Sequence, residues 1–175
     1  MKSLMVIAAA TALFGCGDLL AFPVEASVDE FVVPGDPYLH HDETVLADDV
    51  VPPVEVALDV PVGQGSISLV GFTLALTATS TPEGDQDDLE FLDAVDVHLA
   101  STAPGSVLPV ILVAQWDRSM GKLASDTEVE LGVAGDTNIS PYLSEGFRLD
   151  IRPRGVVPYD DVSFVGAVRF LVSPL

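Results

Sequence analysis

Cysteine and basic residues are scarce in this sequence, which has 175 residues but one Cys and seven Lys or Arg. A single Cys forms no internal disulfide, so the folded chain depends on a hydrophobic core for its stability. Between Ser3 and Trp116 there is no Lys or Arg, although this stretch contains 18 Asp or Glu. Its negative field repels phosphate groups, which argues against nucleic acid as a partner.

Apolar runs long enough to cross a membrane are also absent near the N-terminus. The uncharged run Leu4–Leu13 has ten residues, about half the length that a membrane-spanning helix needs. Because Lys2 precedes it, the run has the proportions of an export signal. We therefore expect residues 1–15 to be a signal peptide.

The signal is followed by Cys16, which ends the tetrapeptide Leu13-Phe14-Gly15-Cys16. This tetrapeptide resembles the lipobox of bacterial lipoproteins, with Leu13, Gly15 and Cys16 as the matching positions. The resemblance implies cleavage before Cys16, a diacylglyceryl group on its thiol and acylation of the new amino terminus. Because two or more acyl chains anchor a protein stably, the resemblance implies a membrane-bound product.

The destination of the protein depends on the residues after this site. In bacterial lipoproteins an Asp directly after the Cys can hold the protein at the inner membrane, but here Gly17 stands in that place. We therefore expect the outer membrane, with the protein on its periplasmic or cell-surface face. As an alternative, Val24-Glu25-Ala26 fits a conventional cleavage site, and cleavage after Ala26 would give a secreted protein without any Cys.

Residues 16–53 are predicted to form an acidic tether that begins with the lipidated Cys. Five prolines interrupt the segment, and its acidic residues follow neither a helical nor a strand period. A flexible chain of this length reaches about 30–35 Å. The folded domain is therefore expected to stand several Debye lengths from the membrane, each about 8 Å.

From residue 54 onward, apolar residues recur at every second position, which is the pattern of half-buried β-strands. The alternating segments include 54–60, 95–99, 129–133 and 147–151. The last segment, 162–172, has apolar residues on both faces and is expected to be a central strand. Seven or eight strands with one short helical turn predict an all-β domain over residues 54–175, an antiparallel two-sheet sandwich. A small closed barrel is the alternative.

Three local features refine this prediction. The apolar pattern changes phase at Gly71, which predicts a β-bulge there. The nearly continuous apolar run Val107–Trp116 is expected to be buried on both faces, with Trp116 in the core or at its rim. Ser140 is expected to cap one helical turn that ends at Gly146.

The densest acidic cluster lies in residues 83–90. Asp85, Asp87, Asp88 and Glu90 crowd hard oxygen ligands into one loop, as Ca²⁺ requires. Their spacing does not match an EF-hand loop, and a solvated loop explains the same pattern. Ca²⁺ is the one cofactor that the sequence suggests. Excess negative charge also fits adaptation to a salty habitat, in which the carboxylates have no specific ligand.

Two histidine motifs were weighed as chemical sites. His98 follows Asp96 on the polar side of a predicted strand, as a catalytic base would follow its orienting carboxylate, but no nucleophile motif accompanies the pair. His40 and His41 offer metal ligands beside Asp42. Adjacent side chains of an extended segment point opposite ways, so these two imidazoles are not expected to share one ion.

Arginines gather in one predicted strand. Arg148, Arg152 and Arg154 are half of the six basic residues that remain after removal of the signal. Such a stripe predicts a site for an anionic group, for instance a carboxylated glycan, unless neighbouring carboxylates pair with it.

Together these features predict a membrane-anchored, non-enzymatic accessory protein of the cell envelope that binds a protein or glycan partner. A Ca²⁺-stabilised adhesion module is the alternative. An envelope hydrolase that uses His98 and Asp96 is the third hypothesis.

Overall fold

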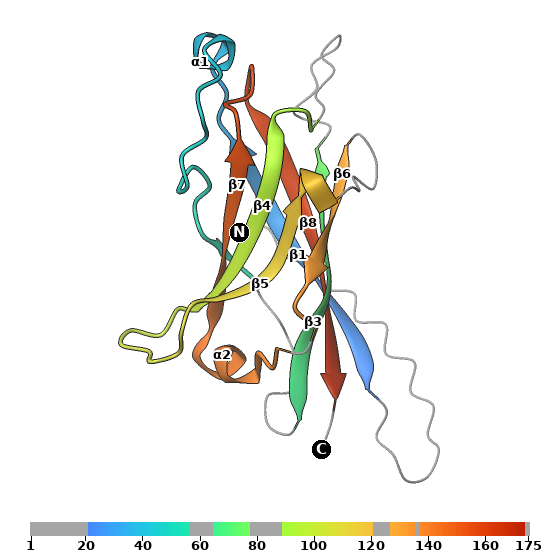
Figure 1. The fold of residues 1–175 in the computed structure, drawn as a ribbon. Helices are drawn as coiled ribbons and strands as arrows, with labels where there is room; N and C mark the ends of the chain where they lie inside the picture. The colour runs from blue at the N-terminus through green and yellow to red at the C-terminus, as the bar shows by residue number, and fades with distance from the viewer. Residues whose placement is uncertain (1–20, 57–64, 78–88, 121–126, 136, 174–175) are drawn as a thin grey trace, which may run out of the picture.

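The computed structural model describes residues 21–56, 65–77, 89–120, 127–135 and 137–173. Within them, eight antiparallel strands form one sheet in the order β1-β8-β3-β6-β5-β4-β7-β2 (Figure 1). The strands are β1 Phe22–Val33, β2 Val54–Glu55, β3 Ser66–Leu76, β4 Leu92–Ser101, β5 Ile111–Asp117, β6 Glu128–Val133, β7 Phe147–Gly155 and β8 Val162–Ser173. The helices are α1 Pro37–His41, α2 Ser140–Glu145 and the 3₁₀ turn η2 Arg118–Met120. The predicted all-β class is confirmed.

The sheet curls into a nearly closed barrel, because its two edge strands, β1 and β2, lie in contact (Figure 1). Apart from the edge strand β2, the shortest strand pairing is between β5 and β6, which are paired at Ala114 with Val133 and at Gln115 with Gly132. This short pairing divides the sheet into two four-stranded halves that share one core, as the halves of a sandwich do. Since the sheet is continuous, the barrel alternative describes it better than two separate sheets.

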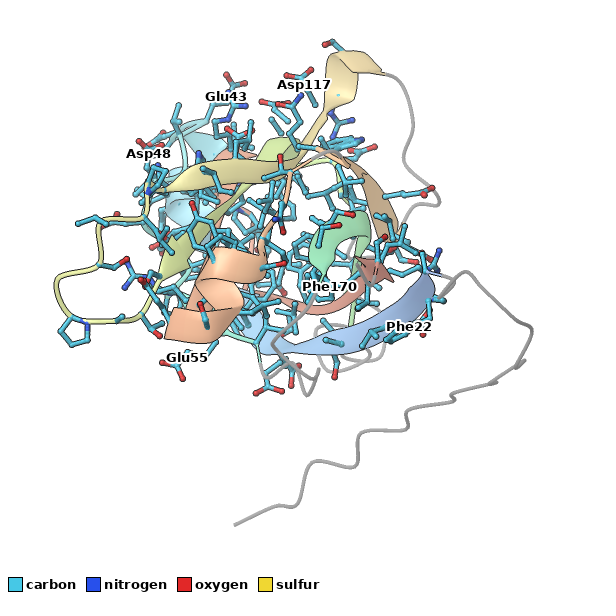
Figure 2. All side chains as sticks on the ribbon, turned by 90° about the horizontal axis from the view of Figure 1, so that it is seen from below. Phe22, Glu43, Asp48, Glu55, Asp117 and Phe170 are labelled. Atoms are coloured by element: carbon cyan, nitrogen blue, oxygen red, sulfur yellow. The ribbon has the colours of Figure 1, made fainter. Side chains whose placement is uncertain are left out.

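Side chains fill the barrel. The largest fully buried ones include Phe72, Phe170, Leu74, Leu99 and Ile151, and Figure 2 shows the interior from below. Two internal cavities have volumes of about 10 Å³ each, which is at the lower limit for a single water. Neither cavity therefore has room for a larger ligand.

The predicted β-bulge in β3 is confirmed. The register between β3 and β8 shifts between Leu69 and Gly71, and Leu69 and Phe72 are both buried. The extra residue restores one buried face to a strand whose apolar pattern changes phase.

The predicted tether is wrong over residues 22–33, which form β1. Val28, Phe31 and Val33 are buried, and β1 pairs with β8 along its whole length. Its register shifts between Val28 and Phe31. This irregularity puts two acidic residues in succession on the outside and breaks the period of two, so the strand pattern escapes detection in the sequence.

Residues 34–53 of the expected tether also pack on the barrel, so the folded domain begins well before residue 54. Asp36 caps α1 by accepting hydrogen bonds from the amides of Tyr38 (2.8 Å) and Leu39 (3.3 Å). Farther along, the side chains of Leu46 and Val51 are buried in the core.

The prediction that Val107–Trp116 is buried on both faces is also wrong. Val107 is 94% exposed and Val110 is 57% exposed, while Trp116 lies in the core at 4%. A barrel wall is one layer thick, so each strand has one face toward the core and one toward solvent. The run of apolar residues instead continues β5 into an exposed loop.

The single predicted helical turn is present as α2, and Gly146 follows it with φ of 78°. Ser140 is the first helical residue and its side chain does not cap the helix. Its hydroxyl oxygen instead accepts a hydrogen bond from the amide of Ile67 (3.0 Å), which joins α2 to the start of β3.

Candidate functional site

The clearest concentration of functional side chains on the described surface lies on the outside of β4 and β7. We call it the β4–β7 face; it comprises Asp96 and His98 on β4 with Arg148, Asp150, Arg152 and Arg154 on β7. Residues of β7 alternate between the core and this face, because successive side chains of a strand point to opposite sides. All three arginines that the sequence singles out therefore share one face.

Two of these arginines are paired within the face. Arg154 Nη2 lies 3.2 Å from Asp96 Oδ2, and Arg148 Nε lies 3.0 Å from Asp150 Oδ1. Both pairs are partly exposed, so each contributes at most about 1 kcal/mol to stability. Their main effect is to neutralise two of the three cations.

Arg152 differs from its neighbours. It is exposed and stands opposite Asp96 in the register, but Asp96 is paired with Arg154. Among the described residues Arg152 makes no ion pair. Its guanidinium is therefore available to an external anionic group in an otherwise acidic molecule.

The His98–Asp96 pair on which the hydrolase hypothesis depends does not form. Asp96 is paired with Arg154, and the carboxylate opposite His98 in the register, Asp150, is paired with Arg148. His98 Nδ1 is buried and has no hydrogen-bond partner in the described part of the chain. The imidazole thus lacks the orienting carboxylate that a general base of this type requires.

Acidic side chains gather at the end of the barrel where β5 and β7 end and β4 and β8 begin, which we call the acidic end. Its members are Asp36, Asp42, Glu43, Asp93, Asp117, Asp160 and Asp161. The hydroxyl and amide of Ser119 lower the pKa of Asp117. All seven carboxylates come from connections between elements or from strand ends, and together they make this end of the described barrel strongly negative.

The expected Ca²⁺ ligands Asp85, Asp87 and Asp88 lie outside the described residues; Glu90 lies within them. Next to it, the Arg118 guanidinium donates hydrogen bonds to the carbonyl oxygens of Leu89 (2.8 Å), Glu90 (3.0 Å) and Leu92 (2.8 Å from Nη2). An arginine therefore holds the C-terminal end of the acidic segment. The sequence contains one weak indication of this role: Arg118 is the first basic residue after Lys2.

His40 and His41 belong to α1, not to an extended tether. His40 Nδ1 lies 3.0 Å from the carbonyl oxygen of Val157, which ties α1 to the connection between β7 and β8. Within the part of the chain that the structure describes, no three His, Cys, Asp or Glu side chains form a metal-binding group.

A second cluster, which no sequence pattern predicted, joins α2 to the β4–β5 loop. The hydroxyls of Ser101 and Ser106 donate hydrogen bonds of 2.6 and 2.5 Å to Glu145 Oε2. These bonds lower the pKa of Glu145 below its usual value. Tyr142 donates from its hydroxyl to the carbonyl oxygen of Pro109 (2.6 Å). Burial, with a smaller contribution from Glu145, raises the Tyr142 pKa.

Comparisons with protein-family models, curated proteins and solved structures find no match. In the described residues, none of the helices has the length and apolar character needed to cross a membrane.

Proposed function

We propose that this protein is a lipid-anchored, non-enzymatic binding module of the bacterial cell envelope, held at the outer membrane by acyl groups on Cys16. The observation that carries the proposal is the position of the lipobox-like sequence. Cys16 precedes the first residue of β1, Phe22, by six residues. The acyl groups would therefore be attached almost directly to a folded barrel.

The packed interior supports binding on the outer surface. Cavities of about 10 Å³ cannot enclose a substrate, and His98 has no orienting carboxylate. The β4–β7 face offers Arg152, a cation without an ion pair among the described residues. The ligand that matches it is a protein or glycan that presents a carboxylate.

The secreted alternative conflicts with the fold. Cleavage after Ala26 would remove Phe22–Ala26, which pairs with Val168–Val172 of β8. The product would lack nearly half of β1, a strand at the edge of the sheet. Cleavage before Cys16 leaves the whole strand intact.

Co-purification from detergent-solubilised membranes tests the proposal. The wild-type protein should carry N-terminal acyl groups by mass spectrometry and recover a partner that a Cys16→Ser protein does not recover. Arg152→Glu should reduce recovery of that partner. Arg169→Glu is the matched control, since Arg169 is an exposed arginine on β8 whose Nε lies 3.3 Å from Glu25. An unacylated N-terminus, or no partner above the Cys16→Ser control, would contradict the proposal.

A further inference from the structure

The loop between β4 and β5, residues 102–110, is an uncharged, apolar projection on a strongly acidic protein. Residues 101–116 include no Asp, Glu, Lys or Arg, although the whole chain has a formal net charge of −20. Val107 is 94% exposed and Val110 is 57% exposed. In Figure 1 the loop, coloured yellow-green, projects sideways from the lower part of the barrel, away from α1. Exposed apolar side chains that cluster in this way mark an interaction surface.

Hydrogen bonds fix this loop in its projecting position. Ser106 donates to Glu145, and its hydroxyl oxygen also accepts from the amide of Leu108 at 3.1 Å. The Tyr142 hydroxyl binds the carbonyl oxygen of Pro109 from the same helix. Since the loop is ordered before it meets a partner, binding does not carry the entropy cost of ordering it.

The loop lies at the same end of the barrel as the start of β1 and the end of β8, which we call the lower end. Phe22 pairs with the end of β8, whose last residue, Ser173, pairs with Ser66 at the start of β3. The next residue, Ile67, binds Ser140 of α2, and α2 holds the loop. Figure 1 shows α2 and the start of β3 at this end, and Figure 2, seen from below, shows Phe22 at the rim of the barrel.

The distance from Cys16 to β1 brings this end close to any membrane that holds the anchor. Phe22 stands six positions after Cys16, and a fully extended chain spans about 22 Å at most over six residue steps. The chain that enters the barrel here is therefore too short to keep the lower end far from the lipid surface.

The distribution of charge favours the same orientation. The acidic end lies at the opposite end of the strands, roughly 30 Å away for tilted twelve-residue strands that rise about 3.3 Å per residue. Of the described carboxylates toward the lower end, Glu145 is bonded to two hydroxyls, Glu25 is paired with Arg169, and Glu55 is exposed. With this end down, the seven carboxylates of the acidic end are several Debye lengths from the headgroups.

We propose that the lower end of the barrel docks on the lipid surface beside the anchor, with Val107 and Val110 inserted between the headgroups. The inference rests on the proposed attachment of lipid to Cys16. Its ligand is a zwitterionic lipid surface, because residues 101–116 provide apolar contacts and no cation for an anionic headgroup.

Fluorescence quenching on vesicles tests this orientation. Full-length lipidated protein with Val107→Cys has one free thiol when Cys16 is acylated, and this thiol can carry an environment-sensitive dye. The matched control is Val45→Cys, because Val45 is 73% exposed and bridges to Val156 just after β7, toward the acidic end. On phosphatidylcholine vesicles that contain nitroxide-labelled lipid, the dye at position 107 should be quenched severalfold more than the dye at position 45.

A second pair of variants separates docking from anchoring. Val107→Glu with Val110→Glu should still float with vesicles through the acyl groups, but protease should cleave its β4–β5 loop as fast on vesicles as in detergent. Wild type and Val45→Glu should be protected on vesicles.

Each outcome bears on one of the two proposals. Flotation with equal quenching at positions 107 and 45 would overturn docking and leave the anchor in place. Failure to float would overturn both. Shielding of position 107 in native membranes but not in pure lipid would overturn the lipid surface as the ligand and indicate a protein partner.

Discussion

The carboxylate of Glu145 lies 2.5 Å from the hydroxyl oxygen of Ser106 and 2.6 Å from that of Ser101, so it joins α2 to the β4–β5 loop and to the last residue of β4. The contact fixes the most exposed apolar segment of the described chain with one acidic side chain. It also makes the order of that segment depend on pH.

The β4–β5 loop should loosen in acid. The two serine hydroxyls lower the pKa of Glu145 from its ordinary value of 4.5. A carboxyl group with a lowered folded pKa stabilises the folded arrangement above its ordinary pKa, and that contribution is lost as the pH falls through the lower value. Amide hydrogen exchange of residues 102–110, corrected for intrinsic rates, should therefore quicken below about pH 4.5.

Glu145→Gln is the control for this prediction, because its amide oxygen still accepts hydrogen bonds but does not titrate in this range. Its loop should exchange at a rate that is nearly independent of pH. An equal acid response in the wild type and in Glu145→Gln would contradict the assignment to Glu145.

Removal of the first part of β1 should destabilise the barrel. A chain that starts at Ser27 lacks Val24 and Ala26, which pack against the core, and leaves the end of β8 without its partner. We expect its free energy of unfolding to fall by about 2–4 kcal/mol relative to a chain that starts at Phe22. Urea denaturation measures the difference. Equal midpoints would show that residues 22–26 do not contribute to the fold.

Gly166 should not tolerate a side chain. It lies on the core side of β8, and a Cβ atom there would stand 2.8 Å from the Cβ of Val28 and 3.2 Å from Phe72 Cε2. We expect Gly166→Ala to lower the free energy of unfolding by about 1–3 kcal/mol through overpacking.

Gly132→Ala is the matched control in β6, since its Cβ would meet Gln115 O at an ordinary 3.5 Å. It should change stability by less than about 0.5 kcal/mol. If Gly166→Ala and Gly132→Ala lower the stability by the same amount in thermal denaturation, close packing around Gly166 does not explain the loss.

Divalent cations should stabilise the protein by general screening of its negative charge. We expect Ca²⁺ and Mg²⁺ to raise the melting temperature equally, because self-repulsion among 27 acidic residues responds to any cation. A shift specific to Ca²⁺ that is lost with Asp87→Asn and Asp88→Asn would contradict this expectation. It would establish a calcium site in the acidic segment and favour the adhesion alternative.

Sequence patterns predicted the fold where strand alternation is regular. β4, β6 and β7 follow the period of two that the sequence displays, and even the bulge at Gly71 leaves a visible change of phase. β1 was missed because its irregularity lies among acidic residues that suggest a solvated segment. The exposure of Val107 was missed because hydropathy alone does not distinguish a buried strand from an apolar loop.

The sequence was enough to predict that the arginines of the candidate site share one face of the sheet, but not which carboxylates they pair with. Strand parity places Arg148 and Arg152 together, whatever the neighbouring strand contributes. Arg154 pairs with Asp96, and this pairing leaves His98 without a carboxylate. Which residues face each other in this way depends on the register between β4 and β7. Register arises from packing of the whole barrel, so a single sequence does not specify it.

The brevity of β2 determines how the barrel can open. β2 pairs with β7 at two positions, and the far end of β7 is held by the connection near Val45 and Leu46. Between β1 and β7 the barrel is therefore closed mainly by side-chain contacts, and we call this part of the wall the seam. By contrast, β8 is paired through its backbone with β1 on one side and β3 on the other. Partial unfolding of lowest free energy should begin at this seam. The seam borders the β4–β7 face through β7, so we expect the strand that carries Arg152 to lie beside the first part of the wall to open.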